Sequence, residues 1–223
     1  YLIVQRYGTT GIAITSFFGG LVNSTAVIGE IASRTRQHSG LSSIGVGAIL
    51  LADAAMALRD LLIVGGFVPH LVPTVGLPLV SIALGGVALS YVVGDWNAEV
   101  ELTFESPFNL RTALTFGGIF LVVLLLSAGA SSLFGSSGFL VTSFFSGLLS
   151  SGAVTTTVVV LYTSGQLTTF VATAGVLVGV GASILVKVAI AASLDRSLVR
   201  PTALASLALV GTGVAAMGLR WVL

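Results

Sequence analysis

The chain has 223 residues, of which 55% are hydrophobic and 8% charged, and its mean hydropathy is +1.09. A soluble domain carries about 25% charged residues and leaves roughly a quarter to a third of its surface in water, so this composition excludes a soluble protein. The net charge of +1 argues against a nucleic-acid partner, and the lack of cysteine excludes disulfides and thiolate metal sites.

The chain starts inside an apolar stretch, residues 1–4, which is followed at once by polar Gln5 and Arg6. This start has neither the basic segment nor the cleavage site of a signal peptide. It has the pattern of a helix tail. We therefore expect the sequence to be a piece of a longer protein.

Seven further segments are long and apolar enough to span a membrane as helices, which requires about 20 residues each. Backbone hydrogen bonds must be satisfied inside the bilayer, and apolar runs such as 119–126 do not alternate as barrel strands do, so helices are predicted. The connecting segments are polar or rich in glycine, serine and proline. The predicted spans are 9–33, 42–67, 72–94, 112–134, 138–162, 168–193 and 202–222.

A thirteen-residue motif occurs twice, at 15–27 and at 142–154, with nine identical positions. Unrelated windows of this composition share on the order of one identity, so the motif indicates an internal repeat. We call the shift along the chain that carries Thr15 onto Thr142 the repeat offset. The fold class predicted is an all-α transmembrane bundle of two repeats. The predicted parts are a first membrane repeat truncated at its N-terminus, a polar acidic loop and a second membrane repeat, at 1–94, 95–111 and 112–223.

The motif at 19–27, an arginine in the next helix and the segment 106–111 before a glycine-containing span together resemble a known family. It is the uncharacterised membrane domain found C-terminal in MgtC/SapB-type proteins. The resemblance covers nearly the whole chain and implies a preceding MgtC-like membrane portion. Through that portion alone it implies a link to magnesium homeostasis, and it offers no substrate. Asn23 departs from the pattern, because a second serine is more usual there.

Two topologies remain open. If every segment spans, the arginines outside the spans divide three against four, which gives no positive-inside signal. If the two motifs form re-entrant hairpins, the arginines divide six against one and the repeats become inverted, a common plan in secondary transporters. The six on one face would be Arg6, Arg34, Arg36, Arg111, Arg196 and Arg200, with Arg220 opposite. The alternative is two parallel repeats of four helices.

Small and hydroxyl-bearing residues lie near the centre of each motif. Such residues let a helix unwind, and their hydroxyls and freed backbone groups can line a path for an ion or solute. The alternative is close helix packing with no ligand. The predicted path residues are Gly20, Asn23, Ser24, Thr25, Gly147, Ser150 and Ser151.

Four intramembrane charges are the second candidate feature: Asp53, Arg59, Asp60 and Lys187. A charge at the bilayer centre costs at least about 2.5–3.5 kcal/mol, so these side chains should face the bundle interior or a water path. Asp53 is the preferred partner of Lys187. The competing interpretation is a salt bridge that only fixes packing. With a one-residue gap, the repeat aligns Arg59 with Lys187.

These features predict an integral membrane transporter or channel for a small ion or solute in a prokaryotic cell membrane, with the path between the two motifs. The alternative is a non-transporting regulatory or scaffolding subunit of the MgtC-like type. No catalytic residue is predicted, because no nucleophile is paired with a base, and no cofactor or metal motif is present. The bilayer is the expected partner, and small-residue runs make a homodimer possible. Unpaired basic groups would favour an anion; carboxylates that neutralise them would favour a cation or a proton-coupled solute.

Overall fold

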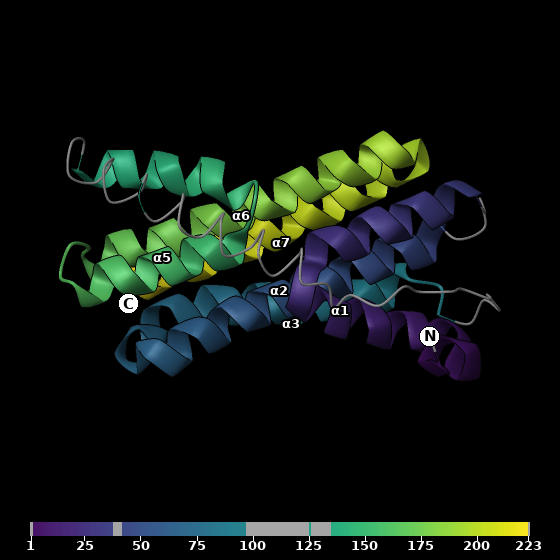
Figure 1. Cartoon of the computed structure of the whole chain (residues 1–223), viewed down its shortest axis with the longest axis horizontal. Coiled ribbons are helices and arrows are strands. Elements are labelled where there is room, and N and C mark those ends of the chain that lie inside the picture. The colour runs from purple at the N-terminus through teal and green to yellow at the C-terminus, as the bar shows by residue number, and fades with distance from the viewer. Residues whose placement is uncertain (1, 38–41, 97–124, 126–134, 223) are drawn as a thin grey trace. The chain divides into compact units, whose positions relative to one another are not determined.

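The computed structural model describes residues 2–37, 42–96, 125 and 135–222, and every regular element among them is a helix. Three long helices and a 3-10 turn precede residue 97, and the same kinds of element follow residue 134 (Figure 1). The first set is α1 (Leu2–Gln37), α2 (Ser42–Phe67), η2 (Pro69–Leu71) and α3 (Val72–Val93). The second set is a helix over 135–147, α5 (Ser151–Thr163), α6 (Thr169–Leu194), η3 (Arg196–Leu198) and α7 (Val199–Val222).

The starts of three consecutive elements recur at the repeat offset found in the sequence motif. The offset carries the start of α2 at Ser42 onto the start of α6 at Thr169, and it relates η2 to η3 and α3 to α7 in the same way. In both places a long apolar helix is followed directly by a tight turn. Pro69 begins η2, and the Asp195 carboxylate accepts a hydrogen bond of 2.9 Å from the Ser197 backbone N–H in η3.

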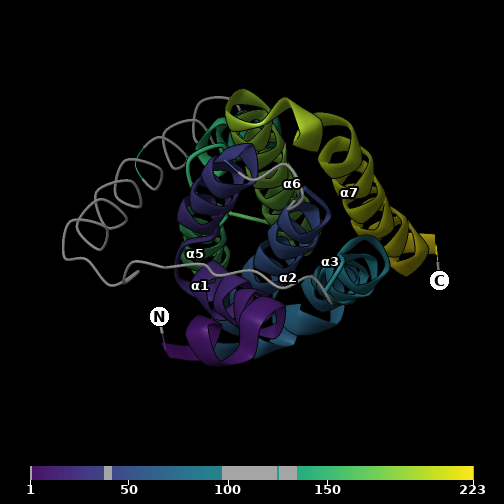
Figure 2. The ribbon, with the colours of Figure 1, turned by 90° about the vertical axis from the view of Figure 1, so that its right-hand side faces the viewer.

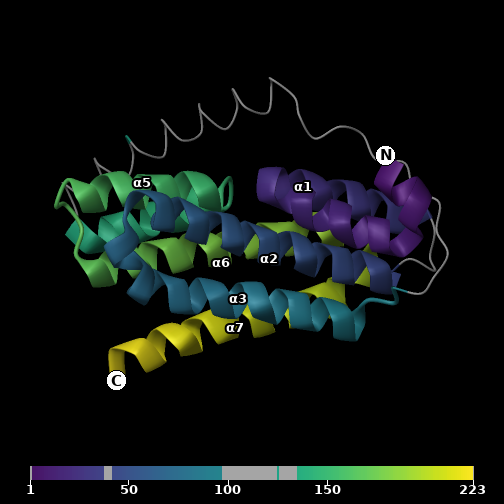
Figure 3. The same cartoon turned by 90° about the horizontal axis from the view of Figure 1, so that it is seen from below.

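Helix α1 keeps helical backbone over 36 residues but is not straight. A Cβ placed on Gly19 would lie 2.8 Å from Cγ2 of Val27. Between these two positions a straight helix would advance about 12 Å, so the contact requires a sharp bend. Figures 1 and 3 show the ribbon of α1 turning back on itself, and Figure 2 shows its two separate arms. We call this bent helix the first hairpin.

The second copy of the motif is interrupted rather than bent. The helix over 135–147 ends, residues 148–150 leave helical geometry, and α5 begins at Ser151. In Figure 1 the two helices run in opposite directions on either side of this interruption. We call the segment 135–163 the second hairpin. The predicted span 138–162 is therefore not a continuous helix, whereas the span predicted over 9–33 lies within α1.

Contacts divide the chain into two compact units, and each unit is assembled from segments that are far apart in the sequence. Unit 1 comprises 1–56, 82–108 and 187–209, and unit 2 comprises 57–81, 109–186 and 210–223. Each unit therefore contains one hairpin and also segments from the other half of the chain. Helices α2, α3, α6 and α7 each contribute residues to both units.

Four helices of the described chain are long and apolar enough to cross a membrane, which supports a membrane protein. Their lipid-facing character is visible in large apolar side chains left exposed, such as Leu84, Val92 and Leu207. Helix α2 has the required length but carries three charges. The predicted span 112–134 and the loop from residue 97 lie outside the described residues, apart from Leu125. The four candidate spans are Thr9–Ala32, Pro69–Val93, Thr169–Ser193 and Arg196–Leu219.

One end of unit 1 brings together segments rich in arginine. Thr9 of α1 donates a hydrogen bond to the Trp96 carbonyl, and Ser42 and Ser197 are joined by a hydroxyl contact of 2.9 Å. A Cβ on Gly45, near the start of α2, would contact Thr35 near the end of α1. Both ends of the first hairpin thus lie with the start of α2 and with η3. These segments contain Arg6, Arg34, Arg36, Arg196 and Arg200.

Candidate functional site

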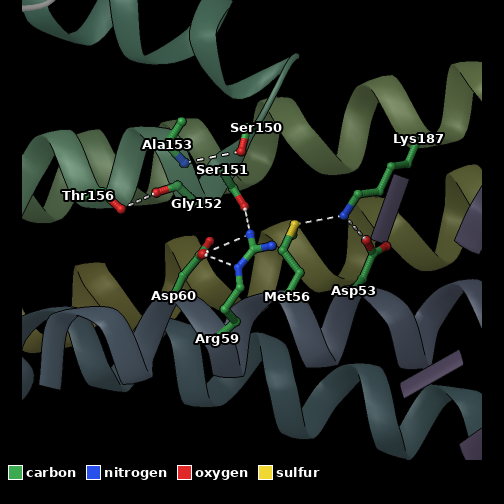
Figure 4. Close-up of polar contacts among 10 residues, drawn as sticks. All are labelled: Asp53, Met56, Arg59, Asp60, Ser150, Ser151, Gly152, Ala153, Thr156 and Lys187. Atoms are coloured by element: carbon green, nitrogen blue, oxygen red, sulfur yellow. Dashed lines mark hydrogen bonds and ion pairs between the residues drawn. The ribbon is translucent and has the colours of Figure 1, made fainter. Parts of the chain in front are cut away.

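The first charged cluster lies inside unit 1 and joins α2 to α6 (Figure 4). Lys187 Nζ is 2.8 Å from Asp53 Oδ1 and 2.8 Å from the Met56 sulfur. Both charged side chains are only 1% exposed. Asp53 is the partner that the sequence predicts for Lys187. The pair is sealed from solvent, because a helix from a distant part of the chain packs over α2 at this point.

The first hairpin crosses α2 immediately beside this ion pair. A Cβ on Gly20 would lie 2.7 Å from the Ala52 Cα and 2.9 Å from the Ala52 carbonyl oxygen. Any larger residue at position 20 would therefore press on backbone. Glycine lets the tip of the first hairpin approach α2 one residue before Asp53.

The second charged cluster lies inside unit 2, at the tip of the second hairpin (Figure 4). Arg59 donates to Asp60 Oδ1 from Nε at 3.2 Å and from Nη2 at 3.1 Å, and Nη2 also donates to the Ser151 hydroxyl at 3.1 Å. The Asp60 side chain is buried, whereas the Arg59 side chain is 21% exposed. Within the described part of the chain, no hydrogen-bond acceptor is recorded for Arg59 Nη1.

Glycine at position 152 leaves room for this guanidinium. A Cβ on Gly152 would lie 2.9 Å from Nη2 and 3.1 Å from Cζ of Arg59. Arg59 therefore lies directly against the first turn of α5. The first turn of a helix is the positive end of the helix dipole. The Arg59 guanidinium and the positive end of α5 are therefore adjacent, and Asp60 is the carboxylate that contacts them through Arg59.

The start of α5 is fixed by a side-chain cap. Ser150 has extended backbone, and its hydroxyl accepts a hydrogen bond of 3.2 Å from the Ala153 N–H. The first hairpin has the equivalent contact at the repeat offset, because Asn23 Oδ1 accepts from the Ala26 N–H at 3.1 Å. In a regular helix that N–H would bond to the carbonyl four residues back. Both hairpin tips therefore begin their second arm with a side-chain cap.

The second hairpin also crosses a neighbouring helix at a motif glycine. A Cβ on Gly147 would lie 2.7 Å from the Gly179 Cα of α6. The repeat offset carries Gly20 onto Gly147 and Ala52 onto Gly179, so this crossing corresponds to the one in unit 1. The paired phenylalanines before each glycine also match, with ring centroids 5.7 Å apart at Phe17–Phe18 and 5.6 Å apart at Phe144–Phe145.

Several buried hydroxyls on the hairpins have no hydrogen-bond partner among the described residues. Two of them, Ser16 and Ser143, stand one turn before the motif glycines, and two more, Thr155 and Thr157, belong to α5. An unpaired buried hydroxyl is unfavourable, so each needs a ligand, a water or another explanation.

The predicted path residues divide between the two units. Ser24 and Gly20 are buried at the first tip, with Asn23 and Thr25 half-buried, and Gly147, Ser150 and Ser151 lie at the second tip. The predicted path residues do not include Met56, Gly152 or Thr155. Met56 and Gly152 are adjacent to the charges only through tertiary structure, and Thr155 is one hydroxyl in a run of three threonines. The described residues contain no group of three metal-ligating side chains.

The family described as "Domain of unknown function (DUF4010)" matches residues 1–195, which is most of the chain. The chain belongs to this family. A relative from Aquifex aeolicus (strain VF5), named "Uncharacterized protein", is 30% identical over 134 residues, covering 57% of this chain and 58% of the relative. No solved structure matches the chain. The family match identifies an uncharacterised membrane-type domain and provides no MgtC/SapB-type context.

Proposed function

We propose that this DUF4010 protein transports a small ion or solute across a membrane and has no enzymatic role. One observation carries the proposal: two helical hairpins in the described chain have side-chain-capped tips related by the repeat offset, and each crosses a neighbouring helix at a motif glycine. The first tip lies beside Asp53, and the second contacts Arg59. Secondary transporters use interrupted helices of this kind to bring backbone donors and acceptors to a site within the bilayer.

An internal duplication is the best account of these matches. The recurring helix starts, caps, glycine crossings and phenylalanine pairs all share one offset, which a chance resemblance of apolar segments would not produce. The alignment that these elements support needs no gap. It places Asp60, rather than Arg59, at the position that corresponds to Lys187.

The arginine-rich end of unit 1 supports a re-entrant first hairpin. Both arms of α1 end there, so Arg6 falls on the same side as Arg34 and Arg36 instead of opposite them. We assign this side to the cytoplasm by the positive-inside rule. In unit 2 the turns at 68–71 and 164–168 contain no arginine or lysine. With a crossing by 112–134, as its composition predicts, the two repeats would be inverted.

The test is flux through the full chain reconstituted in proteoliposomes. The panel contains sodium, potassium, protons, chloride, nitrate, acetate and phosphate. We expect gradient-driven flux of at least one species that is lost in the double variant Asn23→Leu/Ser24→Leu, because leucine removes the cap and the hydroxyl at the first tip. The matched control is Thr10→Leu, at an exposed position of the same helix.

The alternative function has its own outcome in this experiment. A folded wild-type protein that moves no species in the panel would favour a regulatory or scaffolding subunit, for which the hairpins are packing elements. Undiminished flux in the double variant would remove the first tip from the path.

A further inference from the structure

We propose that the tip of the second hairpin binds a small oxyanion, of the carboxylate, nitrate or phosphate class. The site consists of Arg59, Ser151, Gly152 and Thr155. This inference names the substrate class of the path proposed above and so rests on the proposed function.

The first argument is the difference between the two basic side chains. Lys187 is sealed against Asp53 and Met56, whereas Arg59 is partly exposed and its Nη1 has no recorded acceptor among the described residues. Nε and Nη2 both donate to one oxygen of Asp60, so the guanidinium does not make the usual two-oxygen fork with that carboxylate. Nη2 also donates to Ser151, and no acceptor is recorded for Nη1 in the described chain, so the two N–H groups of Nη1 are left for a ligand.

The second argument is the set of donors beside this guanidinium. The N–H groups of Ser151 and Gly152 belong to the first turn of α5, where a helix provides no internal acceptor. The Ser150 cap takes the next N–H, that of Ala153. Two backbone donors and the positive helix end thus lie where the guanidinium rests on Gly152. Asp60 neutralises Arg59 in charge, but it leaves the helix end uncompensated.

The third argument is an independent polar group on the same face of α5. Thr155 is fully buried, and its hydroxyl has no hydrogen-bond partner among the described residues. It stands one turn after Ser151, which accepts a hydrogen bond from Arg59. Helical side chains lean toward the N-terminus, so the Thr155 side chain lies over the turn that contains Ser151.

These groups select an oxyanion by geometry. The Nη1 N–H groups and the backbone N–H groups of the first turn of α5 point in separate fixed directions, which several oxygens of one anion match better than a spherical halide does. The backbone donors and the threonine hydroxyl then reach the remaining lone pairs.

The test is anion-dependent thermal stability of the purified full chain in a buffer whose only other anion is a bulky sulfonate. Acetate, nitrate, phosphate and chloride are the probes. We expect a saturable rise in melting temperature with at least one oxyanion. Arg59→Gln should weaken the apparent affinity about tenfold or more, as expected for loss of a charge-assisted hydrogen bond.

Thr155→Val keeps the test decisive if the Arg59 variant does not fold. Valine has nearly the same shape, so the unliganded protein should be as stable as wild type, while oxyanion affinity falls about three- to tenfold. The matched control is Thr157→Val, a second buried threonine of α5 without a recorded partner, which lies on another face and should leave affinity unchanged.

Two results would overturn the proposal: no oxyanion response in wild type, or equal affinities in wild type and Thr155→Val. A response to chloride alone would refute the oxyanion class. Cation flux in the same proteoliposomes would leave the transport function standing while this inference fails. Absence of all flux would instead count against the proposed function.

Discussion

The two hairpins share a sequence motif but solve the same turn differently. In the first, helical backbone continues around a sharp bend, and Asn23 Oδ1 accepts a hydrogen bond from the Ala26 N–H. In the second, the short segment 148–150 leaves the helix and Ser150 starts a new one. The side-chain cap is therefore common to both hairpins, whereas an interruption of the helical backbone occurs only in the second. A capped N–H marks the start of a second arm in both cases.

The surroundings of the tips differ more than their backbones. Thr25 in the first hairpin stands where Gly152 stands in the second, since the repeat offset carries one position onto the other. At the first tip a Cβ therefore fills the space that corresponds to the one above Gly152, where the Arg59 guanidinium rests in unit 2. One tip therefore lies next to a sealed ion pair, and the other contacts a partly exposed arginine whose Nη1 has no recorded acceptor among the described residues. The two tips differ in the residues that contact charged side chains.

The largest expected effect comes from breaking the sealed pair. Lys187→Met leaves Asp53 buried without its cation, which should lower the free energy of unfolding by about 3–5 kcal/mol. Asp53→Leu/Lys187→Met removes both charges and should recover most of that loss. Arg59→Met, at the partly exposed cluster, should cost less than Lys187→Met. Thermal unfolding in detergent measures all three, and a harmless Lys187→Met would show that the pair is not sealed.

Next in size are the two glycine crossings. Gly20→Ala and Gly147→Ala would each press a methyl group on backbone of the facing helix, at a cost of about 1–3 kcal/mol. The two losses should be similar, since the crossings correspond. Gly29→Ala is the control in α1, because nothing lies within 4 Å of its added Cβ. Unequal losses of unfolding free energy at positions 20 and 147, or a loss in Gly29→Ala, would show that the two crossings are not equivalent.

The smallest expected effect comes from the caps. Ser150→Ala should lower the free energy of unfolding by about 0.5–2 kcal/mol, the usual range for losing an N-cap side chain. Asn23→Ala should cost less, because in a continuous helix the Ala26 N–H can return to the backbone carbonyl of Val22. Amide exchange at Ala26 and Ala153 gives a local measurement. Equal acceleration at both sites would mean that the first hairpin is as fully interrupted as the second.

Much of this architecture is predictable because it depends on local apolar length and on a repeated string. The spans 42–67, 72–94 and 168–193 coincide with helices to within a few residues, and the pairing of Lys187 with Asp53 follows from the cost of burying a lone charge. The bend in α1 is not predictable in this way, because the segment 9–33 is also long enough to cross a bilayer. Composition alone does not distinguish a helix that spans the bilayer from a re-entrant hairpin whose ends lie on the same side.

The Arg59 site shows where sequence reasoning stops. On a helix wheel Arg59 points about 100° away from its neighbour Asp60, so the wheel gives no reason to pair them. The long arginine side chain curls back to the adjacent carboxylate, and a serine 92 positions away completes its contacts. Gly152 is one of 28 glycines, and only tertiary structure shows that this one accommodates the guanidinium.

The interleaving of the two units has a consequence for biosynthesis. Unit 1 cannot close until residues 187–209 have been made, although its opening segment, 1–56, leaves the ribosome long before. Asp53 must therefore enter the membrane without the lysine that will neutralise it, and a carboxyl group waiting in lipid is far less costly when protonated. Arrival of α6 completes the ion pair and locks the first half in place. A chain truncated before Lys187 lacks this pair and the last segment of unit 1, so it should be a substrate for membrane quality control rather than a stable half-protein.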